Sequence, residues 1–117
     1  MMKIRRGDVV LVLFPNSDLR TAKRRPALVI QRDELDNGLS QTIVAMISSN
    51  LARRGHASRI FVSRDSADGK AAGLRLDSVL MTDNLATILE SEMDSVLGHF
   101  PEMKNVDSAL KHTLGLD

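Results

Sequence analysis

The sequence of 117 residues contains no cysteine, no tryptophan and no tyrosine, and only three phenylalanines. The absence of cysteine excludes disulfide bonds and thiolate metal sites, so we expect a protein of the reducing cytoplasm. The scarcity of aromatic residues argues against base-stacking surfaces of the RRM or OB type, because Phe14 and Phe61 lie in apolar runs that we expect in the core. No apolar run approaches the length of a membrane span, and we expect no membrane association.

The charged residues are distributed unevenly, although the net charge is only +1. Residues 1–64 contain 12 Lys and Arg against 5 Asp and Glu, a net charge of +7, whereas residues 65–117 contain 4 against 10, a net charge of −6. This asymmetry predicts a surface in the first half of the chain that faces a polyanion. The alternative is that the two halves interleave and partly neutralise each other. The length fits a single domain over residues 1–117.

Apolar and β-branched runs predict five short strands that alternate with polar loops. The longest of these loops, residues 15–24, has a length that is often functional. We expect one helical turn over 91–94 and a C-terminal helix that starts at Pro101 and ends at Gly115. The predicted fold is mainly β, a small curved barrel with a terminal helix. The five strands are expected at residues 9–14, 28–31, 42–48, 58–63 and 76–82.

Three cations, Lys23, Arg24 and Arg25, stand in a row where the long loop is expected to enter the second strand. Pro26 fixes its own φ and favours an extended backbone at Arg25. The planar guanidinium of Arg25 is suited to binding a phosphate through two parallel hydrogen bonds. The segment therefore indicates phosphate chemistry on a nucleic acid.

Several segments together resemble the MazF/PemK toxin family. They are RGDVVLV at 6–12 with KRRPALVI at 23–30, GLRLDSVL at 73–80 with Thr82-Asp83, and LGHF at 97–100. They occur in the family's order over nearly the whole chain. The resemblance implies an SH3-like barrel of five to seven strands with one terminal helix. It also implies a homodimer, an endoribonuclease that needs neither metal nor cofactor, and inhibition by a cognate antitoxin.

The resemblance also assigns roles to Arg25 and Ser48, which stand at the family's arginine before the proline and at the hydroxyl that ends the third strand. Arg25 would bind the phosphate and stabilise the charge of the transition state. Ser48 would donate a hydrogen bond to a phosphate oxygen. The alternative for Ser48 is a hydrogen bond to the local backbone, which is common for hydroxyls at strand ends.

The sequence departs from the family pattern at several positions. Asp83 matches an acidic residue that some members use as an acid or base, but Met81 stands where those members have an arginine. Ala86 replaces a second arginine. Asp18 is the only carboxylate in the loop where many members carry a glutamate, and its role stays open. The set of phosphate-binding groups is therefore smaller than is usual in the family.

We predict the toxin of a type II toxin–antitoxin pair, which cuts single-stranded RNA in the cytoplasm. Its expected partners are the RNA, a second copy of the chain and an antitoxin with an acidic tail, and it would contact DNA only through that antitoxin. One alternative is a gyrase poison on the same barrel, although such poisons depend on a C-terminal tryptophan that this chain lacks. Another is a non-catalytic barrel that binds RNA or protein. The candidate RNA contacts are Arg20, Lys23, Arg24, Arg53 and Arg54.

Overall fold

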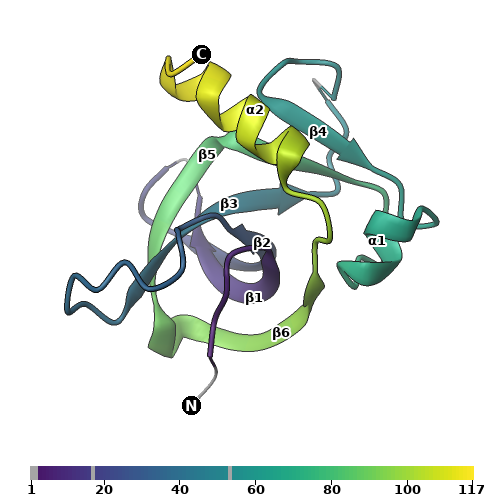
Figure 1. Cartoon of the computed structure of the whole chain (residues 1–117). Helices are drawn as coiled ribbons and strands as arrows, with labels where there is room; N and C mark the ends of the chain where they lie inside the picture. Colours follow the sequence, from purple (N-terminus) through teal and green to yellow (C-terminus); the bar gives the residue numbers. More distant parts are fainter. Residues whose placement is uncertain (1–2, 17, 53) are drawn as a thin grey trace.

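The computed structural model describes residues 3–16, 18–52 and 54–117. Six antiparallel strands form one sheet in the order β4-β5-β3-β2-β1-β6, joined by two α-helices and one turn of 3-10 helix (Figure 1). The elements are β1 (Asp8–Pro15), β2 (Ala22–Val29), β3 (Gln41–Ser48), β4 (Arg59–Val62), α1 (Ala67–Ala71), β5 (Ser78–Leu89), η1 (Glu90–Glu92), β6 (Met93–His99) and α2 (Lys104–Leu114).

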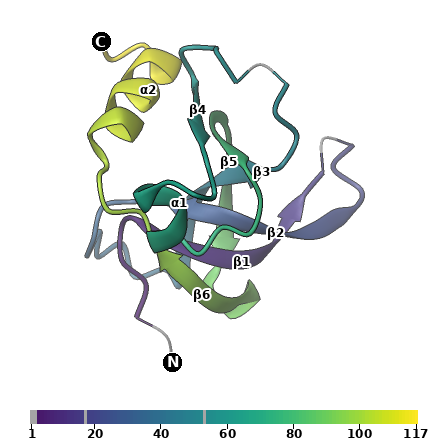
Figure 2. The same ribbon diagram turned by 90° about the vertical axis from the view of Figure 1, so that its right-hand side faces the viewer.

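The sheet is strongly curved (Figures 1 and 2). Its curvature has two local sources, a register shift between Ala45 and Met46 where β3 pairs with β5, and two shifts where β1 pairs with β6. Such irregularities bend a strand and increase its twist. Figure 2 shows the β1–β2 hairpin projecting on the side away from α2. The predicted mainly β fold with a terminal helix is confirmed.

Both faces of the sheet are buried. In β1, Val10, Val12 and Phe14 belong to one apolar cluster, whereas Val9 belongs to a second cluster that includes Val106 of α2. Alternate residues of a strand point to opposite faces. The apolar run of β1 is therefore covered on both faces near Val9 and Val10, whereas Leu13, on the face of Val9, is 43% exposed.

The prediction of a loop over residues 15–24 is wrong, because β2 begins at Ala22 and pairs Leu13 with Arg24. A short turn closes the hairpin, in which the backbone N–H of Asn16 donates to the carbonyl of Thr21 at 2.9 Å. The three cations therefore extend from a strand and not from a loop. Their side chains alternate between its two faces.

The predicted helical turn at 91–94 lies one to two residues earlier, as a turn of 3-10 helix over Glu90–Glu92. Met93 already begins β6, a sixth strand, which the apolar pattern did not predict and which includes the LGH part of the family motif at 97–100. The helix α2 starts at Lys104, three residues later than expected, but Gly115 ends it with a left-handed φ of 71° as predicted. The connection between the expected fourth and fifth strands contains the short helix α1, whose first turn is capped by the side chain of Ser66.

Phe14 is buried, but the expectation of a core position for Phe61 is wrong, because its side chain is 41% exposed. The strand β4 forms an edge of the sheet and pairs only with β5. Phe61 therefore has neighbouring strand on one side alone. No helix in the described part of the chain is long and apolar enough to cross a membrane.

Candidate functional site

A groove of about 430 Å³ lies between the ends of the central strands and the segment that leads into β5. Its walls carry four cations and three serines, and its other lining residues are apolar or glycine. No carboxylate lines it among the residues that the structure describes. The groove therefore suits an anionic ligand with apolar parts. The cations are Lys23, Arg24, Arg25 and Arg75, and the serines are Ser48, Ser49 and Ser78.

Arg25 and Ser48 are brought together at this groove by the pairing of β2 with β3. The observed register sets Ala27 opposite Met46. The ladder ends at this pair, and Arg25 and Ser48 each lie two residues beyond it. Both line the groove. The two residues singled out in the sequence thus share one site, although they come from different strands.

The guanidinium of Arg25 is held from the hairpin but is incompletely bonded. Its Nη2 donates to Oδ1 of Asn16 at 3.2 Å, whereas its Nε is buried and has no hydrogen-bond partner. A buried donor without a partner costs about 1–3 kcal/mol and is uncommon in native proteins. Arg25 is therefore oriented at the groove while part of its bonding capacity remains unused.

Asp18, whose role the sequence left open, organises the hairpin turn. Its carboxylate accepts hydrogen bonds from the backbone N–H groups of Arg20 at 2.9 Å and Thr21 at 3.0 Å, and from the Thr21 hydroxyl. These bonds, the one from Arg20 first, lower the pKa of Asp18 below its ordinary value. A carboxylate with a lowered pKa is a weak base. Asp18 is absent from the groove lining and acts as a structural residue of the turn.

Asp83 is not brought to Arg25 and Ser48. Its carboxylate accepts hydrogen bonds from Arg59, at 3.1 Å from Nε and 3.2 Å from Nη2. Asp83 lies four residues along β5 from Val79, which pairs with Ser48, and this separation corresponds to about 13 Å. A catalytic role for Asp83 stays a prediction. No local pattern indicates its pairing with Arg59, which comes from the neighbouring strand β4.

The predicted RNA contacts in the hairpin divide between the two faces of β2. Lys23 shares a face with Arg25, because alternate residues of a strand point the same way. Arg24 points to the opposite face, the one that carries Leu11 and Pro26 of the groove lining, and it forms an ion pair with Asp94 of β6. Arg20 is exposed at the turn and does not line the groove. Lys23 and Arg24 therefore remain candidates at the groove, and Arg24 is already partly neutralised.

The other two predicted contacts belong to the β3–β4 connection. Arg54 is exposed, and its guanidinium carbon lies 5.4 Å from the centre of the Phe61 ring. Arg53 lies outside the described residues. Arg54 is not among the groove-lining residues.

Arg75 is a groove residue that the sequence analysis did not single out. It follows Gly73, whose φ is +74° and whose Cα comes so near β6 that an added Cβ would lie 2.2 Å from the carbonyl oxygen of Leu97. Glycine is thus required for the close approach that places the Arg75 segment at the groove. In the sequence, Arg75 is recognisable only as a cation two residues after a glycine. Its position in the groove beside residues of β2 depends on the tertiary fold.

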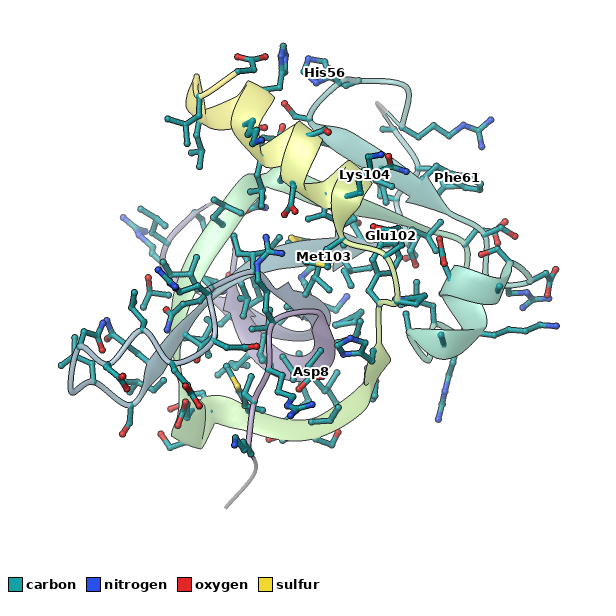
Figure 3. The ribbon with its side chains drawn as sticks, in the orientation of Figure 1. Asp8, His56, Phe61, Glu102, Met103 and Lys104 are labelled. Atoms are coloured by element: carbon teal, nitrogen blue, oxygen red, sulfur yellow. The ribbon has the colours of Figure 1, made fainter. Side chains whose placement is uncertain are left out.

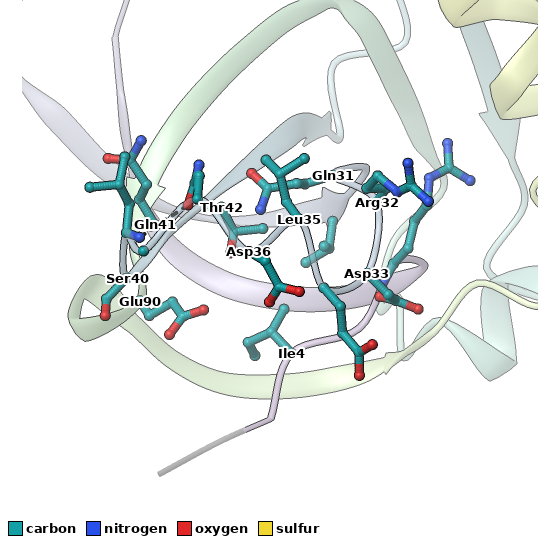
Figure 4. A pocket seen from close by; sticks show the side chains of 16 residues that line it. Ile4, Gln31, Arg32, Asp33, Leu35, Asp36, Ser40, Gln41, Thr42 and Glu90 are labelled. Atoms are coloured by element: carbon teal, nitrogen blue, oxygen red, sulfur yellow. Dashed lines mark hydrogen bonds between the residues drawn. The ribbon is translucent and has the colours of Figure 1, made fainter.

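A second hollow, of about 320 Å³, lies beside the β2–β3 connection (Figure 4). Its lining mixes four carboxylates with two arginines. This balance does not favour a polyanion. The carboxylates are those of Asp33, Glu34, Asp36 and Glu90, and the arginines are Arg6 and Arg32. Within the described ranges, no group of three or more His, Cys, Asp or Glu side chains is placed to hold a metal ion.

Comparison with known proteins identifies the family. Residues 5–114 match the family model described as a PemK-like, MazF-like toxin of type II toxin-antitoxin systems. The chain belongs to this toxin family. Relatives of the MazF-like family include endoribonuclease MazF6 of Mycobacterium tuberculosis, which is 31% identical over 98% of this chain and 100% of the relative. Endoribonuclease EndoA of Bacillus subtilis is also 31% identical, over 98% of this chain and 97% of the relative.

Solved structures of MazF-like toxins share the fold. A mycobacterial endoribonuclease in complex with its cognate antitoxin aligns over 98% of both chains with a TM-score of 0.75 and 18% identity. MazF of Deinococcus radiodurans aligns over 98% of this chain and 99% of its own, with a TM-score of 0.73 and 19% identity. The resemblance inferred from the sequence motifs is confirmed over nearly the whole chain.

Proposed function

We propose that this chain is the toxin of a type II toxin–antitoxin pair and that it cuts single-stranded RNA by a metal-independent reaction in the cytoplasm. The observation that carries this proposal is the cationic groove that Arg25 and Ser48 both line, which has no carboxylate among its described lining residues. Family membership and the endoribonuclease names of the relatives support the same reaction. They favour it over the gyrase poison and over a barrel without catalytic activity. We take residues 1–117 as one toxin domain.

The reaction is a transfer of the phosphoryl group within the RNA strand. The 2′-oxygen bonds to the adjacent phosphorus while the bond from phosphorus to the 5′-oxygen breaks. The 2′-hydroxyl loses its proton, and a proton reaches the departing 5′-oxygen. The products are a 2′,3′-cyclic phosphate and a 5′-hydroxyl. In the transition state between the RNA substrate and these products, negative charge builds up on the non-bridging oxygens of the phosphate. Hydrogen-bond donors that contact these oxygens lower the barrier.

Each of the groove residues would have its own role in this reaction. Arg25 would donate to the non-bridging oxygens and stabilise their charge. Ser48 would donate its hydroxyl proton to the same phosphate. Lys23 and Arg75 would neutralise the neighbouring phosphates. This arrangement compensates for the arginines that Met81 and Ala86 replace.

Asp83 remains the proposed acid–base partner, on the strength of the family motif. In the free protein its carboxylate is bonded to Arg59. We therefore expect Asp83→Asn to lower cleavage less than Arg25→Ala does. An equal loss in the two variants, with unchanged folding, would place Asp83 at the reacting atoms.

The proposed partners follow from the charge of the groove. An antitoxin segment rich in Asp and Glu would occupy the groove and compete with RNA, and any contact with DNA would pass through that antitoxin. A symmetric homodimer would extend the groove across a two-fold axis. Light scattering at micromolar concentration tests the homodimer, which a purely monomeric mass would exclude.

The reaction is tested by incubating the purified chain with end-labelled single-stranded RNA in EDTA. We expect cleavage whose products resist 5′-phosphate-dependent exonuclease and carry a cyclic phosphate at the 3′ end. Cleavage that requires added Mg²⁺, or products with a 5′-phosphate, would contradict the proposed mechanism.

A further inference from the structure

Phe61 is an exposed aromatic residue in a chain that has no tryptophan and no tyrosine. It lies on the edge strand β4, at the margin of the molecule (Figure 3). The guanidinium of Arg54 lies over its ring, 5.4 Å from the ring centre. Two flat, exposed groups of this kind are the elements from which proteins build stacking sites for nucleobases.

The strand register places Phe61 on the same face of the sheet as Ser48 of the groove. Phe61 is opposite Val79, and Val79 is opposite Ser48. Residues paired in this way point to one face, and adjacent strands are about 4.8 Å apart, so Phe61 and Ser48 are about 10 Å apart. Val79 between them is fully buried, so an RNA strand that joins the two sites would pass over the groups that cover it.

We propose that Phe61, with Arg54 beside it, is a stacking site for a nucleobase of the same RNA strand whose phosphate is bound at Arg25 and Ser48. This inference rests on the proposed function. A base inserted between the ring and the guanidinium would need about 7 Å, twice the usual contact distance of about 3.5 Å. The observed 5.4 Å is too short. The base therefore takes the place of Arg54 above the ring, and Arg54 turns to the adjacent phosphate.

Stacking of this kind tolerates any base, because every base presents a flat π-face. The site would therefore strengthen binding near the scissile phosphate without fixing the cleavage motif. It gives a function to an aromatic side chain that contributes little to either core. It would also add to the affinity for RNA. This addition matters here because the chain has fewer phosphate-binding arginines than is usual in the family.

The absence of tryptophan from the chain allows a direct test. In Phe61→Trp the new indole is the only one, and base stacking quenches its emission. The probe is a single-stranded oligonucleotide of mixed sequence in which every 2′-oxygen is methylated, so that it binds without being cut. We expect it to quench Phe61→Trp, to bind that variant at least as tightly as wild type, and to bind Phe61→Leu about tenfold more weakly. Leu116→Trp, at a site 72% exposed near the C-terminus, is the matched control whose emission stays unchanged.

The outcomes separate this inference from the proposed reaction. Unquenched emission from Phe61→Trp together with wild-type affinity in Phe61→Leu overturns the stacking site, whether or not the wild-type protein cuts RNA. Quenching and weakened binding support the site even if no RNA is cut, in which case the nuclease proposal alone falls. A concentration-dependent change in emission without oligonucleotide would assign Phe61 to a contact between copies and overturn the proposal. Thermal unfolding by circular dichroism confirms that each variant is folded.

Discussion

Gly73→Ala adds one methyl group where the chain comes close to β6, and we expect this methyl group to lower the stability of the fold strongly. Gly73 has a φ of +74°, and the added Cβ would lie 2.2 Å from the Leu97 carbonyl oxygen and 2.9 Å from its carbonyl carbon. The left-handed backbone costs an alanine about 1 kcal/mol. Moving the backbone away from the clash costs a further 1–3 kcal/mol or so. We therefore expect a loss of about 2–4 kcal/mol in the free energy of unfolding.

The matched control is Gly115→Ala, at a φ of +71° with nothing within 4 Å of the added Cβ. It carries the backbone cost without the clash, so we expect about 1 kcal/mol. For a domain of this size 1 kcal/mol corresponds to about 4 °C in Tm. Thermal unfolding should thus show a decrease of about 8 °C or more for Gly73→Ala and about 4 °C for Gly115→Ala. Equal decreases would refute the argument that Gly73 is required for the close approach.

Three further predictions concern the groove and the hairpin. Ser48→Ala should lower kcat for RNA cleavage about tenfold, because one hydrogen bond to the transition state is lost. Ser49→Ala, the control, should leave kcat within twofold, and equal effects of the two variants would exclude the proposed role of Ser48. The pKa of Asp18 is lower in the folded state, so its carboxylate stabilises the hairpin fully above the ordinary value of 3.8 and loses that effect as the pH falls below it. The protection of the turn amides from hydrogen exchange, relative to the intrinsic rate at each pH, should therefore decrease in acid, and Asp18→Asn should remove this decrease; a decrease that persists in this variant would exclude Asp18 as its cause. Arg75→Ala should decrease the salt dependence of RNA binding by about one phosphate contact. Arg24→Ala should decrease it less, because Arg24 is already paired with Asp94. The reverse order would place the RNA nearer to Arg24 than to Arg75.

The sequence predicted those parts of the fold that depend on local pattern. The apolar run around Val10 identifies a strand covered on both faces, and Gly115 identifies the end of the last helix. The sequence could also predict that Arg25 and Ser48 share one site, because the resemblance assigned both residues to it. Each of these depends on residue type and spacing within a short segment.

Other features depend on side-chain contacts that the pattern of polar and apolar residues does not show. The hairpin extends to Ala22 because the side chains of Asn16 and Asp18 close its turn locally, whereas polarity alone suggested a longer loop. The next two depend on distant segments. Phe61 reads as a core residue until β4 is known to be an edge strand. Asp83 appears as a free carboxylate until Arg59 is placed beside it on the neighbouring strand. These assignments required the strand order, which no local pattern encodes.

The measurement that most directly tests the account is the rate of RNA cleavage in EDTA by wild type, Arg25→Ala and Arg32→Ala. Arg32 is an exposed arginine of the mixed-charge hollow, so its variant removes one positive charge without touching the groove. We predict that kcat/KM falls by 100-fold or more in Arg25→Ala, on the order of 3 kcal/mol of transition-state stabilisation, and stays within twofold in Arg32→Ala. Equal activity of the three proteins would contradict the assignment of the groove as the site of cleavage.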